Sequence, residues 1–179
     1  MYHSTLYSSP VGSLTLAGND ESIVGLWLEN QKYFGDTVLG QHILKSETPV
    51  LRKAKEWLDR YFAGEKPAVS ELSLAPDGSD FRREVWRMLC EIPYGEVTTY
   101  SRIAKRMAVR MNREKMSAQA VGGAVGHNPI SIIIPCHRVI GTNGSLTGYA
   151  GGIGNKLRLL EFEGVDPSRF YVPAKGTAL

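Results

Sequence analysis

The feature that most constrains the fold of this chain is a break in its patterning at residues 64–79. This segment contains Pro67, Pro76, Asp77 and Gly78, and it follows neither the two-residue period of a strand nor the 3.6-residue period of a helix. Such a segment is typical of a connection between two folding units. We therefore expect two domains, residues 1–78 and residues 79–179.

The first unit is predicted to be a sheet covered by one helix. Leu14 and Leu16 alternate with other residues, and residues 23–28 form a second strand-like segment bounded by turn signals, which favours an antiparallel hairpin sheet. Thr48 precedes Pro49 in the arrangement that begins a helix. Apolar residues then recur on one helical face until Gly64: Leu51, Ala54, Leu58, Tyr61 and Phe62.

The second unit is predicted to contain three successive helices. The first begins near Phe81 and ends before Pro93, the second follows the capping pair Thr98–Thr99 to about Met107, and the third runs from Ser117 to Val125. Two short helices joined in this way favour a helix-turn-helix, with the third helix as the recognition helix.

Most residues of the third predicted helix are alanine or glycine, so its surface carries few large side chains. It contains Gly122 and Gly123, each of which costs about 1 kcal/mol relative to alanine in a helix interior. Two explanations remain open. The bare surface permits close packing on another helix, or it enters a narrow minor groove and leaves room for an extruded nucleotide.

A cysteine and a histidine follow an apolar run, Ile132–Ile134, which we interpret as a buried strand. The sequence continues Pro-Cys-His-Arg-Val at residues 135–139. A thiolate is the reactive form of cysteine, and a neighbouring imidazole can remove the thiol proton. The pair therefore indicates a nucleophilic site, although a cysteine packed in the core is the simpler explanation for an isolated pair.

The flanks of this pair carry several further motifs. They are Ala-Val-Gly-Gly-Ala-Val-Gly-His-Asn-Pro at 120–129, Gly-Ser-Leu-Thr-Gly-Tyr-Ala-Gly-Gly at 144–152, and Lys-Leu-Arg-Leu-Leu-Glu-Phe-Glu-Gly at 156–164. Upstream lie Phe81 and Ile-Pro-Tyr-Gly-Glu-Val-Thr-Thr-Tyr at 92–100. In order and spacing, residues 79–164 closely resemble the O6-alkylguanine-DNA alkyltransferases, which repair DNA by direct reversal.

The resemblance implies a fold and a reaction. The fold is an α/β N-terminal domain, with a ribonuclease-H-like sheet and a helix, followed by a mostly α winged helix-turn-helix domain. The implied reaction is a single-turnover transfer of the alkyl group from O6-alkylguanine, and from O4-alkylthymine, in DNA to the protein's own cysteine. The implied partner is double-stranded DNA bound through its minor groove by a monomer, and no cofactor or metal is expected.

The resemblance also assigns roles to the catalytic residues. Cys136 becomes the alkyl acceptor, His137 draws off its proton through a water molecule, and Glu163 orients His137. Tyr100 donates to the leaving guanine, and Asn128 braces the recognition helix against the active-site loop. A local observation agrees for Glu163, because an acid before the capping Gly164 is disfavoured by the helix dipole.

Other residues are assigned to the base and to DNA. Tyr149, Ala150 and Gly151 match the loop that closes over the flipped base, and the backbone of Cys136 and Val139 would read the edge of that base. Arg138 is interpreted as a brace for the loop.

On the DNA side, Ala120 and Arg102 belong to the expected contact surface. Gln119 occupies the position where the family usually has an intercalating arginine, and Lys115, one turn earlier, is the alternative source of that charge. The loop from Met107 to Met116 is longer than is usual in the family and is strongly basic.

Charge and composition agree with this interpretation. Residues 1–78 carry 7 Lys and Arg against 10 Asp and Glu, whereas residues 79–179 carry 14 against 8. The densest basic run is opposed within the sequence only by Glu114, and it is predicted to follow DNA phosphates. Its members are Arg102, Lys105, Arg106, Arg110, Arg113 and Lys115. With no apolar run of membrane-spanning length and no signal-peptide pattern at the start, a cytoplasmic protein without a membrane partner is expected.

Alternatives from other functional classes remain. The first is a non-catalytic protein that recognises alkylated DNA, against which the presence of Cys136 argues. A cysteine hydrolase using Cys136, His137 and Glu163 would show turnover beyond one equivalent. A helix-turn-helix regulator would need no thiol site.

Overall fold

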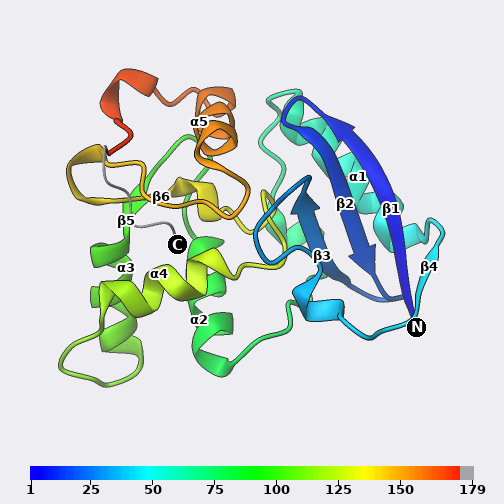
Figure 1. Ribbon diagram of the computed structural model, residues 1–179, viewed down its shortest axis with the longest axis horizontal. Helices are drawn as coiled ribbons and strands as arrows, with labels where there is room; N and C mark the ends of the chain where they lie inside the picture. Colours follow the sequence, from blue (N-terminus) through cyan, green and yellow to red (C-terminus); the bar gives the residue numbers. More distant parts are fainter. Residues whose placement is uncertain (174–179) are drawn as a thin grey trace.

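Four strands from the first 45 residues form one sheet in the computed structural model, which describes residues 1–173 (Figure 1). The strands are β1 (Tyr2–Ser9), β2 (Gly12–Gly18), β3 (Ile23–Leu28) and β4 (Ile43–Lys45). β1 pairs antiparallel with β2, and β2 pairs antiparallel with β3, which confirms the predicted hairpins. β4 pairs parallel with β1 at the other edge, so the sheet is mixed.

One helix, α1 (Pro49–Phe62), covers a face of this sheet (Figure 1). The hydroxyl of Thr48 accepts a hydrogen bond from the amide of Leu51 at 3.4 Å and caps the helix as predicted. The buried face of α1 includes four of the five predicted residues, while Phe62 is half-buried. Helix and sheet are held together mainly by this apolar face.

The segment at residues 64–79 is bound along the edge of the sheet. The amide of Ile23 donates to the carbonyl of Ser73 at 2.9 Å, and the amide of Ala75 donates to the carbonyl of Ile23 at 2.8 Å. The indole of Trp57 also donates to the carbonyl of Ala68 at 2.9 Å. The connection contains one 3₁₀ turn, η2 (Val69–Glu71), and contacts both the sheet and α1.

The second half of the chain is mainly helical and lies beside the sheet (Figure 1). The three helices predicted for this half begin where the sequence indicated. They are capped by the side chains of Ser79, Thr99 and Ser117. The indole of Trp86 donates to the carbonyl of Ala124 at 2.8 Å and fixes α4 on α2. The helices are α2 (Asp80–Leu89), α3 (Tyr100–Arg110), α4 (Ala118–Gly126) and α5 (Ile153–Phe162).

Two short strands and four 3₁₀ turns complete the described elements. The strands β5 (Thr98–Thr99) and β6 (Val139–Ile140) pair in parallel. The turns are η1 (Asp36–Val38), η3 (Cys136–Arg138), η4 (Thr142–Gly144) and η5 (Pro167–Arg169). Among residues 1–173, no helix has both the length and the apolar character required to cross a membrane.

The prediction of a buried strand at Ile132–Ile134 is wrong. All three residues are buried, but they form a compact turn in which the amide of Ile134 donates to the carbonyl of Ile130 and Ile132 has a φ of +71°. The amide side chain of Asn128 binds the backbone of Ile130 and Ile134 and replaces the partners that a neighbouring strand would give. A continuous apolar run indicates burial and does not separate these two structures.

One continuous core joins the two halves of the chain. The amide of Leu26 in β3 donates to the carbonyl of Pro129 at 2.8 Å, and the carbonyl of Leu26 accepts from Ser131 at 2.9 Å. Buried side chains of the sheet, of α1 and of helices α2–α5 belong to a single cluster. The end of α4 and the turn that follows it are therefore fixed against the N-terminal sheet.

Candidate active site

Cys136 and His137 lie in the 3₁₀ turn η3, immediately before β6. The Cys136 residue is 3% exposed and His137 is fully buried. Parallel pairing of Thr98 with Val139 places the start of α3, and with it Tyr100, beside this turn. Val139 is itself fully buried beside the turn.

His137 is bound to Glu163 across the site. The imidazole Nε2 donates to the carboxylate Oε2 at 2.8 Å, although the two residues are 26 positions apart in the sequence. Glu163 follows the last residue of α5 as its C-cap, and Gly164 with a φ of +79° ends the helix. Among the described residues, none is hydrogen-bonded to the buried Nδ1 of His137, which is the nitrogen left to accept a proton.

Arg138 holds the same carboxylate from the other side. Its Nε donates to Glu163 Oε1 at 2.5 Å, and its Nη1 donates to the carbonyl of Ile92 at 2.7 Å. The arginine side chain is only 8% exposed. Buried ion pairs of this kind depend on each partner for compensation of charge. The contacts agree with the predicted bracing function of Arg138.

The electrostatics of the site leave the thiol protonated and the imidazole neutral at rest. Burial raises the pKa of the Cys136 thiol, and burial lowers the pKa of the His137 imidazole. Burial also raises the pKa of the Glu163 carboxyl, but hydrogen bonds and charges from His137 and Arg138 outweigh it and hold that pKa below its ordinary value. An ionised Glu163 thus faces a neutral base that can accept a proton.

Asn128 connects the end of α4 to the cysteine turn. Its Nδ2 donates to the carbonyl of Ile134 at 2.8 Å, and its Oδ1 accepts from the amide of Ile130 at 3.0 Å. Burial raises the pKa of the Cys136 thiol, and the nearby amide of Asn128 is the largest of the effects that oppose this rise. The residue is therefore placed to brace the turn and to stabilise a thiolate.

Tyr100 points at the loop that follows β6. Its hydroxyl donates to the carbonyl of Thr147 at 3.0 Å and approaches that of Gly148 at 3.5 Å. Burial, followed by the nearby Cys136, raises the pKa of this phenol, so it remains a donor. The hydroxyl thus lies near the cysteine turn, and in this structure it donates its hydrogen bond to carbonyls of the loop.

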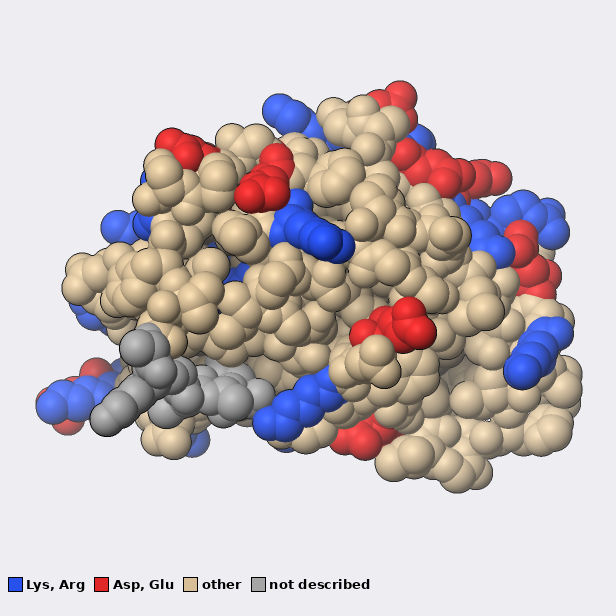
Figure 2. All heavy atoms as spheres, turned by 45° about the horizontal axis from the view of Figure 1, so that its top comes forward, with Lys and Arg blue, Asp and Glu red and all other residues tan. Residues whose placement is uncertain are grey.

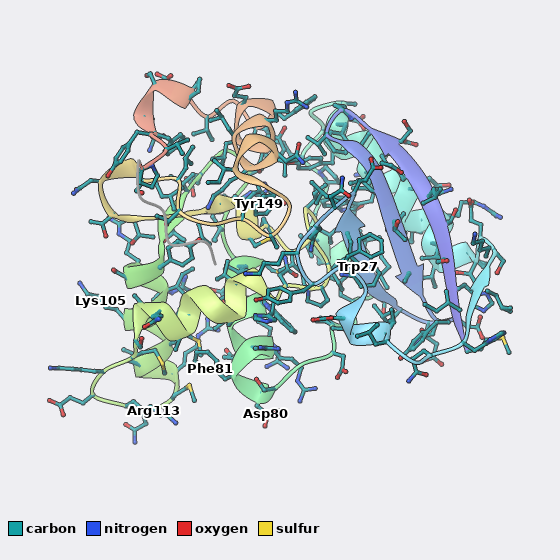
Figure 3. The ribbon with its side chains drawn as sticks, viewed as in Figure 1. Trp27, Asp80, Phe81, Lys105, Arg113 and Tyr149 are labelled. Carbon is teal, nitrogen blue, oxygen red and sulfur yellow. The ribbon has the colours of Figure 1, made fainter. Side chains whose placement is uncertain are left out.

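The loop at 149–151 is held by the N-terminal half of the chain. The amide of Lys32 donates to the carbonyl of Ala150 at 2.8 Å. A Cβ on Gly151 would lie 3.1 Å from the side chain of Leu28, which shows how closely the loop approaches β3. Tyr149 is half-buried and lies below α5 in the view of Figure 3. Sequence analysis did not predict these contacts, because they join residues more than 100 positions apart.

The residues assigned to DNA lie on the surface. Gln119 and Ala120 are exposed in the first turn of α4, Lys115 is exposed in the preceding loop, and Arg102 is exposed in the first turn of α3. A Cβ added to Gly123 would meet nothing within 4 Å. Close packing on another helix therefore does not explain this glycine, and the helix is open there.

The basic run is less uniform than its sequence indicates. Arg106 contacts Glu91, and Arg110 binds Glu91 at 2.6 Å and Glu84 at 2.7 Å, so two cations of the run face acids in α2 and in the turn that follows it. These ion pairs could not be predicted from the sequence, because the acids lie about 20 positions upstream of the arginines. Lys105 and Arg113 project outward from α3 and from the loop after it (Figure 3). On the face drawn in Figure 2, basic and acidic side chains are interspersed.

One buried cation was missed by the sequence analysis. Lys156 in α5 is fully buried, and its Nζ donates to the carbonyls of Thr147 and Gly148 at 3.4 and 3.2 Å. The signal was available, because Lys156 stands at helical spacing from the apolar residues Ile153 and Leu160. Within residues 1–173, no group of three or more His, Cys, Asp or Glu side chains could hold a metal ion.

Known families cover both halves of the chain. Residues 80–165 match the DNA-binding domain of 6-O-methylguanine DNA methyltransferase, and residues 2–76 match the ribonuclease-like domain of the same protein class. The chain belongs to the 6-O-methylguanine DNA methyltransferase family.

Particular relatives agree with this membership. A methylated-DNA--protein-cysteine methyltransferase of Haemophilus influenzae is 42% identical over 159 residues, which are 89% of this chain and 84% of the relative. One from Methanosarcina barkeri is 40% identical over 91% of this chain and 97% of its own. The crystal structure of Mycobacterium tuberculosis OGT in complex with DNA superposes with a TM-score of 0.78, at 40% identity and with 94% of each chain covered.

Proposed function

We propose that this protein repairs DNA by moving the alkyl group of O6-alkylguanine, and of O4-alkylthymine, onto Cys136 in a single turnover. The observation that carries the proposal is the buried hydrogen bond between His137 and Glu163, directly beside the thiol of Cys136, in a chain of this family. Residues 79–179 supply the DNA-binding and reacting groups, and residues 1–78 support them. The two separate family matches are consistent with this division.

The reaction follows from the protonation states of the site. Nδ1 of His137 receives the thiol proton through a bridging water, and Glu163 stabilises the resulting imidazolium. The Cys136 sulfur then forms a bond to the alkyl carbon while the bond from that carbon to O6 breaks. The electron pair stays on the guanine, where a hydrogen bond from Tyr100 lowers the barrier.

The DNA is bound through its minor groove by α4, and the protein acts as a monomer. The target base must leave the stack to reach a buried sulfur. Tyr149, Ala150 and Gly151, with the backbone of Val139, form the pocket for the extruded base.

Exposed cations and the start of α4 hold the duplex. Arg102 contacts the phosphates, and Ala120 with the open surface at Gly123 lets the helix approach the groove. Gln119, or the neighbouring Lys115, fills the space left in the duplex.

The proposal is tested by intact-mass measurement after incubation with a duplex containing O6-methylguanine. We expect one added CH2 per protein on Cys136, a plateau at one equivalent, and no transfer by Cys136→Ala, which should still bind the duplex. Product beyond one equivalent would indicate a hydrolase. Binding of methylated DNA without any mass change would indicate a recognition protein.

A further inference from the structure

The segment between β3 and η1 holds an aromatic residue in an unusual backbone conformation. Asn30, Tyr33 and Gly35 have φ values of +60°, +60° and +70°. Glycine and asparagine adopt this left-handed region readily, whereas a bulky residue such as Tyr33 does so at a cost in free energy. Such a conformation persists only where the surrounding contacts fix it. The contacts of Tyr33 therefore indicate what the segment does.

Tyr33 stacks on His127 from the second half of the chain. The two ring centres are 3.9 Å apart, and the ring planes differ by 20°. His127 is the C-cap of α4, and its Nδ1 donates to the carbonyl of Gly123 at 2.7 Å. The backbone amide of His127 binds the same carbonyl at 3.2 Å. The imidazole thus closes the last turn of α4, and the ring of Tyr33 covers that imidazole.

The two residues before Tyr33 contact other parts of the second half. Gln31 is buried, and its Oε1 accepts from the hydroxyl of Ser131 at 3.0 Å in the compact turn that follows α4. The amide of Lys32 donates to the carbonyl of Ala150 at 2.8 Å in the loop that follows β6. Three consecutive residues therefore bind the end of α4, the turn after it and the loop beside the active site.

These contacts fix the spacing of two surfaces that a duplex must meet together. In the function proposed above, α4 lies in the minor groove and the loop at 149–151 receives the base that leaves the stack. The groove and the extruded base belong to one DNA molecule. A shift of α4 relative to the loop would therefore misplace the base over the sulfur of Cys136.

We propose that Tyr33 is a positioning residue for duplex DNA: its stack on His127 holds the end of α4 at the spacing from the 149–151 loop that an extruded base requires. The inference rests on the function proposed above, since it concerns the same DNA complex. Tyr33 acts through His127 and α4 rather than on the reacting atoms. Loss of its ring should therefore affect the reaction of duplex DNA and leave the chemistry of the sulfur unchanged.

The test compares Tyr33→Asn, which suits the left-handed region but lacks the ring, with Tyr33→Phe, which keeps the ring. Phe34→Asn is the matched control, because Phe34 lies in the same segment but packs on Trp27 of β3. Single-turnover transfer is measured at saturating DNA, on a duplex and on a single strand that contain O6-methylguanine. Hydrogen exchange without DNA follows the amides of residues 121–128.

Tyr33→Asn should slow transfer on the duplex roughly tenfold or more, since a misplacement of about 1 Å can cost about 100-fold. Transfer on the single strand should keep its rate, because that base is already out of a duplex. Exchange at the end of α4 should become faster. Tyr33→Phe and Phe34→Asn should behave like the wild type. His127→Asn should also slow the duplex reaction, and the double variant with Tyr33→Asn should be no slower than His127→Asn alone.

Three results would overturn the inference. Equal slowing on both substrates would make Tyr33 a purely structural residue. A wild-type duplex rate in Tyr33→Asn, or additive losses in the double variant, would show that the stack does not position α4. Unchanged exchange at the end of α4 would show that Tyr33 does not hold it. If the wild type itself transfers no methyl group, the proposed function fails, whereas the exchange measured without DNA still reports on Tyr33 and α4.

Discussion

Glu163→Gln tests the arrangement of the site most directly. The carboxylate is fully buried and accepts from both His137 and Arg138. Glutamine has nearly the same shape, but it carries no charge and has a single acceptor oxygen for these two donors. The change therefore removes the counter-charge of Arg138 and the orientation of His137 while the packing is kept.

The expected loss of stability follows from the burial of the ion pair. Removal of one partner of a buried pair costs about 3–5 kcal/mol, and the remaining oxygen of glutamine places this case near 3 kcal/mol. In a chain of this length, each kcal/mol lowers the melting temperature by about 2–4 °C, so a fall of roughly 6–12 °C is expected. The rate of alkyl transfer should fall about 100-fold, because a general base that is no longer oriented loses most of its contribution.

The pH dependence of this loss has a definite sign. The pKa of Glu163 is held below its ordinary value of 4.5, so its stabilisation is complete above that pH and disappears as the pH falls through the lower, folded-state pKa. The stability difference between Glu163→Gln and wild type should therefore be constant near neutrality and shrink in acid.

Denaturant unfolding at several pH values and single-turnover transfer measure both effects. Glu161→Gln is the control, because Glu161 is exposed on the same helix and should change neither quantity. A Glu163→Gln protein as stable as this control, or one with an unchanged rate, would refute the assignment.

Three further changes have separate expectations. Tyr100→Phe should slow single-turnover transfer and lower the free energy of unfolding by only about 1 kcal/mol, since one hydrogen bond to a carbonyl is lost. An unchanged rate would make Tyr100 a structural residue. Gln119→Arg should speed transfer on duplex but not on single-stranded substrate, unless Lys115 already supplies the charge, in which case Lys115→Ala should weaken duplex binding. Asn128→Ala should lower both the stability of the protein and the rate of transfer, because the side chain holds the backbone of the cysteine turn. Calorimetry and a single-turnover measurement give the two quantities, and a loss of stability without a loss of rate would contradict this expectation.

Much of the fold was predictable because its signals are local. Thr48, Thr99 and Ser117 all cap the helices that their sequence positions indicated. Each capping residue acts on an amide three positions later, so the information lies within one turn.

The missed features depend on contacts between distant segments. The turn at 132–134 is stabilised by the side chain of Asn128 rather than by a neighbouring strand, and the apolar run by itself could not reveal this. The hydrogen bond of β3 with Pro129 and that of Lys32 with Ala150 each join the two halves of the chain. The pairing of Arg110 with Glu84 in α2 and with Glu91 just after it likewise arises from the packing of α3 beside α2.

The roles of the site residues remain predictions, although the structure brings the central residues together. Proximity of Glu163 to His137 could be expected only through the family resemblance, because the spacing of 26 residues has no local meaning. Lys156 could have been singled out from its place on an apolar helix face.

The shared core also limits how this chain can be cut or recombined. A fragment beginning at residue 79 would expose the carbonyl of Pro129 and the amide of Ser131, which now bind the edge of β3 at Leu26. The same fragment would lose the contact that Lys32 makes with Ala150. Any replacement for the first half must therefore present a matching strand edge and a matching amide. Otherwise the second half will have unpaired backbone groups close to the turn that holds Cys136.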